Sequence, residues 1–503
     1  MTSPKVLMLL FDGAEWNVIH PLLRAGRLPH LAAFMREGSY GRLRSLDDVA
    51  LASPVLWTSF ASGKLAHKHG VRDFYATASS VQCVRLWEIF EREQLPIGLF
   101  RYLITWPPRP TKGFIVPDWC ARTAEAFPAE LSFINAMPQT KNWQGLLRNG
   151  RLAIRHGLRP SSAVLALREW LREKVLNPAR LDKKFRQRLV ELAIHTDLFC
   201  WLLRRYHPHF AVFYTGLPDA VHHEYWKFME PEKFPDVSVT EANRYGGVIP
   251  LIYEKLDQKL GRILRQVSRE TLVVIASDHG GEANVEEEYR WGEIRGEDFI
   301  NALGFNGAIS TFRIGPKSFF RLRNRSGAVK SIAQVAERVR NTTLAGSSTP
   351  IFQVEVRGED EMAVEVNYLK EAVEGRQIQF PDRGTYPIER LLNLSPTISG
   401  NHSMHGILLM RGPGVRQNYE ISQASLVDVT PTILALLGRP VGRDMDGHVL
   451  TEAMDSEFLH RQPVQFIDSY EELLGKRPVP PAEDPEVGLE LVNERLRALG
   501  YLE

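Results

Sequence analysis

The chain has 503 residues, and at roughly 150 residues per domain it holds material for about three domains. Forty-four per cent of the residues are hydrophobic, which excludes an intrinsically disordered chain. Lys and Arg number 62 against 60 Asp and Glu, a net charge of +2, and this balance argues against a dedicated nucleic-acid-binding protein.

The cysteines and the apolar runs indicate the cellular compartment in which the protein is expected. Cys83, Cys120 and Cys200 lie far apart without CxxC spacing, which excludes a disulfide scaffold and a structural zinc-thiolate site and fits a reducing compartment. The longest early apolar run, residues 6–11, is too short for a signal-peptide core or a membrane span. We therefore expect a soluble, cytoplasmic protein without a transmembrane segment.

Continuous apolar runs alternate with helical periodicity along the chain. Such runs are typical of parallel strands that are covered on both faces, and strands that alternate with helices predict an α/β fold. We expect a mostly parallel central sheet flanked by helices. The predicted strands are residues 6–11, 209–214, 271–276 and 406–410, and the clearest predicted helices are residues 187–206 and 248–267.

Two stretches are predicted to be insertions into this core. Residues 141–206 contain 15 Lys and Arg against 5 Asp and Glu with helical periodicity, which indicates either a solvated basic helix face or a cap that attracts an anionic substrate or a membrane surface. Residues 301–390 mix short strand-like pieces with turns. The expected plan is a core of residues 1–120, 207–300 and 391–455, a basic helical cap of residues 121–206, an accessory α+β subdomain of residues 301–390, and a tail of residues 456–503 with an amphipathic helix over 483–503.

Acidic residues and histidines follow the predicted strands. Asp12 ends the first strand, Asp219 follows the second, Asp278 and His279 end the third, and His402 precedes the fourth. Ligands gather at the carboxyl ends of parallel strands, so these side chains are candidates for one site. Each also has an ordinary explanation, as a turn, a helix cap or a loop histidine.

Spacing and residue type add detail to this candidate site. Asp219 and His223 are four residues apart, which places them on one face of a helix. Residues 53–63 are rich in hydroxyls, and we expect a loop-to-helix transition there that puts Thr58 at a helix N-terminus, where N–H groups favour an anion. Asp, His and hydroxyl oxygen suit zinc or a similar divalent ion, and a metal can activate a hydroxyl for attack on phosphorus. The chain has no GxxxxGK[ST] P-loop and no GxSxG elbow.

These pieces together resemble the alkaline phosphatase superfamily, in particular its type I phosphodiesterase/nucleotide pyrophosphatase branch. The matching motifs are residues 10–13 (LFDG), 28–31 (LPHL), 53–60 (SPVLWTSF), Asp219 with His223, 277–280 (SDHG), 400–402 (GNH), 412–415 (GPGV) and 428–438. The resemblance implies one metal held by Asp12, Thr58, Asp278 and His279, and a second held by Asp219, His223 and His402. It implies Thr58 as the nucleophile, a phospho-threonine intermediate, zinc or alternatively manganese as the cofactor, and a small-molecule or lipid-linked phosphate ester as the substrate.

The sequence departs from the family pattern after the His-Gly motif. Nucleotide-cleaving members have an asparagine shortly after that motif, whereas residues 69–74 read HGVRDF, so Lys64 or Arg72 is expected to contact the phosphate. His405 competes with His402 as the last ligand, and we favour His402 for its offset from Gly400. Transfer of the phospho group to an alcohol, or a binding protein that has lost catalysis, remain alternatives to hydrolysis of a phosphodiester or a monoester.

Overall fold

The computed structural model describes residues 5–47, 51–137, 143–176, 178–234, 237–284, 292–305, 308–314, 317–322, 331–348, 350–366, 375–394, 399–474 and 488–492. The chain divides into two compact units. The core unit is Met1–Ala283 with Gly400–Arg495, and the accessory unit is Asn284–Ser399 with Leu496–Glu503.

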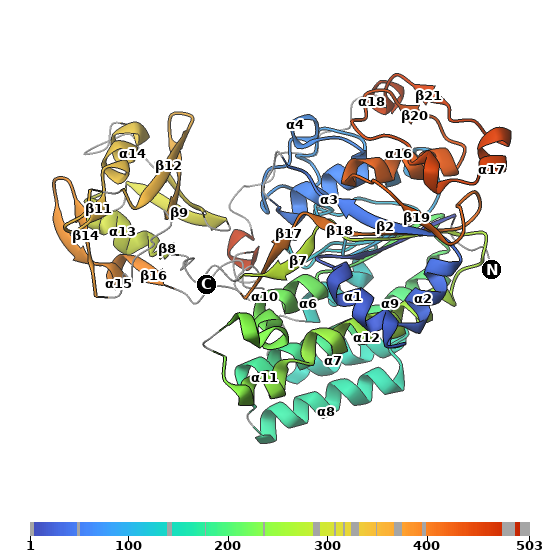
Figure 1. Ribbon diagram of the computed structural model, residues 1–503, viewed down its shortest axis with the longest axis horizontal. Helices are drawn as coiled ribbons and strands as arrows, with labels where there is room; N and C mark the ends of the chain where they lie inside the picture. The colour runs from blue at the N-terminus through green and yellow to red at the C-terminus, as the bar shows by residue number, and fades with distance from the viewer. Residues whose placement is uncertain are drawn as a thin grey trace. The chain divides into compact units, whose positions relative to one another are not determined.

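The core unit is built on an eight-stranded sheet, which confirms the predicted mostly parallel α/β fold (Figure 1). Five of its seven strand pairs are parallel, and β18 runs antiparallel to both of its neighbours. The strand order is β19 (Tyr419–Ile421), β2 (Ser39–Arg44), β18 (His405–Arg411), β6 (Leu272–Ala276), β1 (Val6–Phe11), β5 (Phe210–Thr215), β3 (Ile97–Phe100) and β4 (Phe114–Val116).

Helices cover both faces of this sheet, which explains why β1 is apolar at every position. Leu7, Leu9 and Phe11 point to one face and belong to one apolar cluster with residues of the helices there, and the alternate residues of β1 are buried on the other face. The first face carries α1 (Trp16–Arg24), α2 (Pro29–Arg36), α9 (Arg180–Tyr206), α10 (Leu217–Met229) and α12 (Val248–Leu264), and the second carries α3 (Ser53–Ser62) and α16 (Val429–Leu436) (Figure 1).

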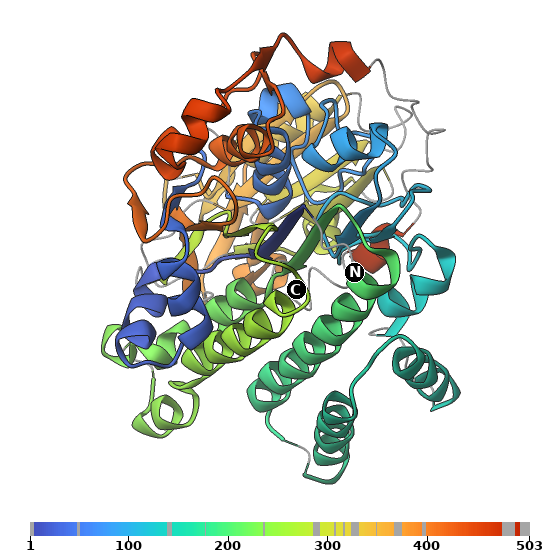
Figure 2. The same cartoon turned by 90° about the vertical axis from the view of Figure 1, so that its right-hand side faces the viewer.

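The basic stretch of residues 141–206 forms three helices, α7 (Trp143–Arg155), α8 (Pro160–Leu176) and α9 (Figure 2). Helix α9 packs on the sheet through Leu192, Leu198 and Phe199, while α8 packs on α9. Among the described residues, no helix combines the length and the apolar character that a membrane span requires.

Shorter elements complete the core unit. A two-stranded antiparallel sheet, formed by β7 (Gly280–Ala283) and β17 (Gly400–Ser403), lies beside the end of β6. The others are α4 (Ala66–His69), α5 (Leu86–Arg92), α6 (Phe133–Ala136), α11 (Val239–Tyr245), β20 (Val441–Gly442), α17 (Ser456–Arg461), β21 (Phe466–Ile467) and α18 (Tyr470–Leu474). Of the predicted tail helix over 483–503, only residues 488–492 are described, and 489–492 are helical.

The accessory unit has its own apolar core of α and β elements. It begins before and ends after the predicted stretch of residues 301–390, because β8 (Gly292–Ile294) pairs with β16 (Leu392–Leu394). Its other elements are α13 (Gly296–Leu303), β9 (Ile309–Ile314), β10 (Lys317–Leu322), α14 (Ile332–Arg340), β11 (Thr343–Leu344), β12 (Phe352–Arg357), β13 (Glu361–Val366), β14 (Gln377–Phe380), β15 (Gly384–Pro387) and α15 (Ile388–Leu391).

Candidate active site

The carboxyl ends of three adjacent strands bring the predicted acidic residues together. Strand β1 lies between β5 and β6 and is parallel to both, so Asp12 after β1, Asp219 at the start of α10 and Asp278 after β6 meet at one edge. His402 reaches the same edge because β17 pairs with β7, with His402 opposite Gly281.

A glycine allows the closest approach within this edge. The backbone N–H of Asp219 donates to the carbonyl oxygen of Asp12 over 3.1 Å. Gly13 has a φ of +71°, and a Cβ there would lie 2.8 Å from the Cα of Asp219. Any larger residue at position 13 would therefore push apart the two strand ends that carry Asp12 and Asp219.

Six of the seven predicted metal-site residues form one cluster, in which His402 is half-buried and the other five are buried. The His279 Nε2 lies 3.2 Å from Asp12 Oδ1 and 3.8 Å from Asp278 Oδ2. On the other side, Asp219 Oδ1 lies 3.1 Å from His223 Nε2 and 3.3 Å from His402 Nε2, and the rings of His279 and His402 stack with centroids 4.0 Å apart. Two overlapping groups have the spacing of cation sites, namely Asp12, Asp278 and His279, and Asp219, His279 and His402.

Contacts outside the cluster orient its side chains. His223 and His279 each bond a backbone carbonyl through Nδ1, at 2.8 Å to Gly400 and Gly280, so their Nε2 atoms face the cluster. Asp12 Oδ2 accepts bonds from Trp57 Nε1 at 3.0 Å and from the Tyr214 hydroxyl at 2.6 Å, which turns its Oδ1 toward His279.

The orientation of Asp12 predicts an effect of Tyr214→Phe. Removing this donor is expected to weaken metal affinity about 10- to 100-fold, the usual effect of losing such an outer contact. Isothermal titration of the metal-stripped protein with zinc measures it. Tyr470→Phe is the matched control, because the Tyr470 hydroxyl donates to the carbonyl of Pro440 and touches none of the cluster; equal losses of affinity in both variants would contradict the role of Tyr214.

The cluster contains buried polar atoms without a hydrogen-bond partner. They are Asp12 Oδ1, both carboxylate oxygens of Asp278 and His279 Nε2. Buried polar atoms have a hydrogen-bond partner in the great majority of cases. Several unpartnered atoms that lie close together are therefore consistent with a cation bound between them. Carboxylate oxygen and imidazole nitrogen are ligands of zinc and of similar divalent metals.

The titratable side chains of the cluster strongly shift one another's pKa values. Burial raises the pKa of Asp278, and the nearby carboxylate of Asp12 raises it further. Burial opposes charge on His279, but Asp278 and Asp12 raise its pKa to about 10. Burial favours a neutral Asp219, but His223 and His402 hold its pKa well below the usual range, and burial together with His279 lowers the pKa of His402 to about 4. Such perturbed pairs are typical of functional sites.

Comparison with known protein families decides the assignment. The sequence model of the family "Type I phosphodiesterase / nucleotide pyrophosphatase" matches residues 6–406. The chain belongs to this family. This confirms the resemblance seen in its motifs, and it supports a phosphate ester hydrolase that uses divalent metal.

The solved structures that are similar to the chain include a human and a murine protein. Human ectonucleotide pyrophosphatase/phosphodiesterase 5 is 13% identical over 90% of this chain and 100% of that chain, with a TM-score of 0.48. The murine protein of the same name, in an inactive form in complex with AMP, is 14% identical over 91% of this chain and 99% of that chain, with a TM-score of 0.46. No curated protein matches the sequence significantly.

The predicted position of Thr58 at a helix N-terminus is wrong. In this member of the family, α3 begins at Ser53, with Ala52 as its N-cap and Pro54 in its first turn, so Thr58 lies in the middle of the helix. Its hydroxyl donates to the carbonyl of Pro54 over 2.7 Å, the bond that a threonine makes inside a helix.

The hydroxyl at the N-terminus of α3 belongs to Ser53, which sequence reasoning missed. Ser53 is buried, and it lies one helical turn before Trp57, on the same face of α3. Because Trp57 bonds Asp12, this face of α3 is the one that borders the cluster. Proline in the first turn of a helix is a start signal that pointed to Ser53 rather than Thr58.

His69 of the His-Gly motif has a structural role beneath α3. Its Nδ1 accepts the backbone N–H of Val71 at 3.1 Å, so its Nε2 carries the proton and donates to Ser59 Oγ at 2.9 Å. Burial lowers the pKa of His69 to about 4, which keeps the ring neutral. The His-Gly motif therefore anchors the turn that follows α4 to helix α3.

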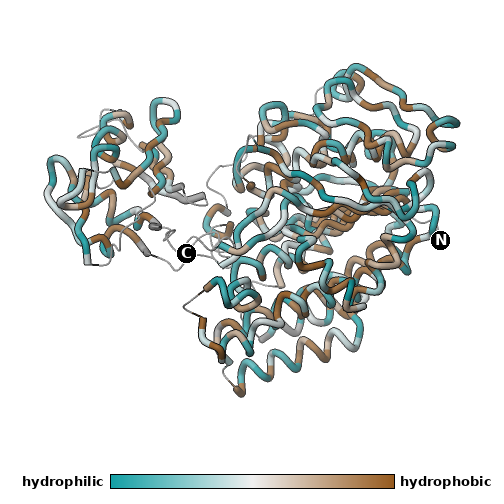
Figure 3. The backbone as a smooth tube through the Cα atoms, viewed as in Figure 1, coloured by the Kyte–Doolittle hydropathy of each residue, from teal (hydrophilic) through white to brown (hydrophobic). Residues whose placement is uncertain are grey.

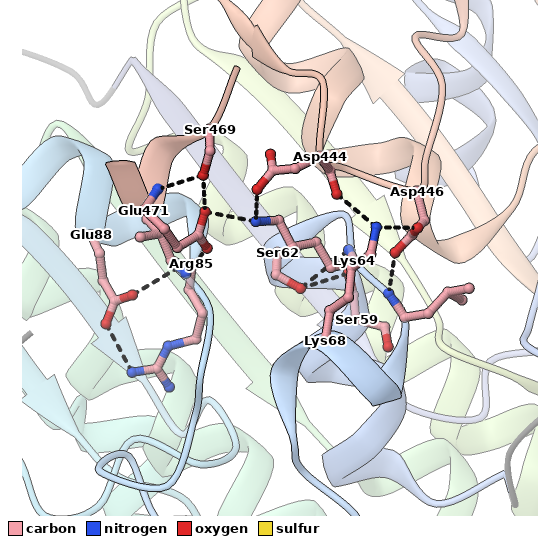
Figure 4. Close-up of polar contacts among 12 residues, drawn as sticks. Ser59, Ser62, Lys64, Lys68, Arg85, Glu88, Asp444, Asp446, Ser469 and Glu471 are labelled. Atoms are coloured by element: carbon pink, nitrogen blue, oxygen red, sulfur yellow. Dashed lines mark hydrogen bonds and ion pairs between the residues drawn. The ribbon is translucent and has the colours of Figure 1, made fainter. Parts of the chain in front are cut away.

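Lys64, expected to contact a substrate phosphate, lies in an ion-pair network instead (Figure 4). Its Nζ is 2.6 Å from Asp444 Oδ2 and 2.7 Å from Glu471 Oε2, and its side chain is only 5% exposed. Burial opposes its charge, but the two carboxylates raise the pKa of Lys64. Lys68 similarly binds Asp446, so both lysines connect the C-terminal segment to the region of α3 and α4.

The other two residues that the sequence offered, Arg72 and His405, are exposed. His405 lies at the start of β18, where its backbone pairs with that of Arg44 in β2, and it does not join the cluster.

The network predicts that Lys64→Met affects stability more than catalysis. The change leaves Asp444 and Glu471 partly buried without their cation and is expected to lower the free energy of unfolding by about 3 kcal/mol. Lys68→Met breaks a more exposed pair and is expected to cost about 1 kcal/mol. Urea unfolding measures both, and a large rise in KM with unchanged stability in Lys64→Met would restore its role in substrate binding.

Proposed function

We propose that this chain is a two-metal phosphodiesterase that works through a phosphorylated hydroxyl residue at the N-terminus of α3. The observation that carries the proposal is the cluster of three aspartates and three histidines beside that helix, in which unpartnered atoms of Asp12, Asp278 and His279 lie close together. The metals we propose are zinc ions, with manganese as the alternative.

We propose Ser53 as the nucleophile, in place of Thr58. Ser53 is supported by its position at the first residue of α3 and by the contact of Trp57, one turn later, with Asp12. The N–H groups of the first turn of α3 would bind phosphate oxygens there. Thr58 is disfavoured because its hydroxyl is already donated to Pro54.

The proposed reaction has two displacements at phosphorus. The Ser53 oxygen bonds to phosphorus while the bond to the leaving alcohol breaks, and the alcohol leaves with a proton. A water oxygen then bonds to phosphorus, the bond to Ser53 breaks, and the serine regains its proton. When bound, the divalent cations would lower the pKa of the attacking hydroxyl and of the water, and would offset charge on the phosphate oxygens.

The cluster residues have distinct parts in holding these ions. We propose that Asp12, Asp278 and His279 hold one, and that Asp219, His223 and His402 hold the other, with the Nδ1 bonds of His223 and His279 keeping Nε2 directed inward. A small-molecule or lipid-linked diester is the substrate class. A cytoplasmic location is supported by three cysteines that are all buried and that lie far apart in the sequence without CxxC spacing.

A metal analysis paired with two chromogenic esters tests this function. Purified protein is expected to hold two divalent ions per chain and to hydrolyse bis-(p-nitrophenyl) phosphate faster than p-nitrophenyl phosphate. Faster monoester hydrolysis would reassign the ester class, and transfer products formed when alcohols are added would make it a transferase. Protein that binds zinc or manganese but turns over neither ester would be an inactive member of the family.

A further inference from the structure

Helix α8 exposes more large apolar side chains than any other described element. Val164, Leu167, Leu171 and Val175 are 64%, 57%, 46% and 75% exposed, and Trp170 and Leu176 are exposed as well. Single exposed apolar residues are ordinary on protein surfaces, but a contiguous patch marks an interaction site. Figure 3 shows hydrophobic stretches along this peripheral helix.

Four of these exposed apolar residues form one stripe. Spacings of three, four and four residues place Val164, Leu167, Leu171 and Val175 on one face, which we call the α8 outer face. The buried residues of α8, Ser162 and Glu169, lie on the opposite face. Because α8 packs on α9 through the opposite face, the outer face points away from α9, and α8 lies at the periphery of the core unit (Figure 1).

Charge on α8 is distributed in the same asymmetric way. Its two acidic residues are paired with cations: Glu173 lies 2.5 Å from Lys183 of α9, and Glu169 lies 2.8 Å from Arg168 of α8 itself and 3.5 Å from Arg186 of α9. Arg172 and Lys174 are exposed and flank the outer face. Helix α7 adds Arg148, Arg151 and Arg155, which are exposed and share one helix face.

We propose that α8 docks on the surface of an anionic lipid bilayer. The apolar stripe of the outer face would enter the boundary between headgroups and acyl chains, with Arg172 and Lys174 at the lipid phosphates and Trp170 at the interface. A helix that exposes apolar side chains along one face, with cations at the flanks, can lie in the membrane plane in this way. A second copy of the chain fits this face poorly, because it would bring the same cations against each other.

Vesicle flotation with the full chain tests this docking. The protein is expected to float with vesicles of phosphatidylcholine and phosphatidylglycerol, to float much less with phosphatidylcholine alone, and to be released by high salt. Leu167→Gln/Leu171→Gln is expected to weaken binding at least about tenfold, since it removes the apolar contacts. Arg172→Gln/Lys174→Gln is expected to weaken binding to the anionic vesicles alone.

Val239→Gln/Leu473→Gln is the matched control, because it replaces two exposed apolar residues outside α8 and is expected to bind as the wild type does. Hydrolysis of a soluble diester and the melting temperature verify that each variant is folded. Absence of vesicle binding, or equal binding by the α8 variant and the control, would overturn the proposal. A dimer that Leu167→Gln/Leu171→Gln dissolves, without vesicle binding, would replace it with self-association.

Discussion

Ser53→Ala is expected to reduce kcat for a phosphodiester by about 10³-fold or more while both metal ions remain bound. The reason is that removal of a covalent nucleophile eliminates the intermediate, whereas the cluster of aspartates and histidines is unchanged. Steady-state kinetics on bis-(p-nitrophenyl) phosphate and metal analysis of the same sample measure both effects. Retention of metal distinguishes loss of the nucleophile from collapse of the site.

Thr58→Val is the matched control for this experiment. It removes the other candidate hydroxyl of α3 at nearly constant volume, together with one bond to Pro54, and is expected to cost about 1 kcal/mol of stability with little loss of kcat. Acid quenching during turnover, followed by peptide mapping, should locate the phosphoryl group on Ser53. A phosphorylated Thr58, with an inactive Thr58→Val and an active Ser53→Ala, would reinstate the threonine.

The sequence predicted the framework of the site because its signals are local. Strands buried on both faces read as continuous apolar runs, and an Asp directly after such a run must lie at the carboxyl edge of the sheet. Asp12 and Asp278 could therefore be placed from a few neighbouring residues. The i,i+4 spacing of Asp219 and His223 was a sufficient signal for their common helix face.

Other features depend on contacts that no local pattern reveals. The carboxylates that pair with Lys64 lie 380 and 407 residues away in the sequence, so nothing near Lys64 indicated that its charge was already balanced. The antiparallel direction of β18, which brings its start to the edge where β6 ends, likewise follows from pairing rather than from composition. Which side of α8 faces α9 was also undetermined, since its apolar residues could equally have formed a buried face.

Asp278→Asn is expected to lower activity by about 10³-fold or more and to leave about one divalent ion per chain. Both Asp278 oxygens are buried without a hydrogen-bond partner and face His279 and Asp12, and an amide offers one acceptor and no charge in their place. The same substitution also removes an unfavourable contribution to the free energy of folding, since burial and the carboxylate of Asp12 both disfavour a charged Asp278. Chelated Asp278→Asn should therefore melt at a higher temperature than chelated wild type.

Asp278→Asn is thus expected to lower activity and metal content but to raise the melting temperature of the chelated protein, and these opposite changes make the experiment decisive. Chelation should lower the melting temperature of the wild type by more than about 5 °C, because metal that binds only the folded state stabilises it, and the drop should be smaller in Asp278→Asn. Asp257→Asn is the control, since this buried aspartate accepts the N–H groups of His30 and Leu31; it should lose stability but keep its metal and activity. If Asp278→Asn keeps two ions and full activity, the cluster at the ends of β1, β5 and β6 is not where the ester is cleaved.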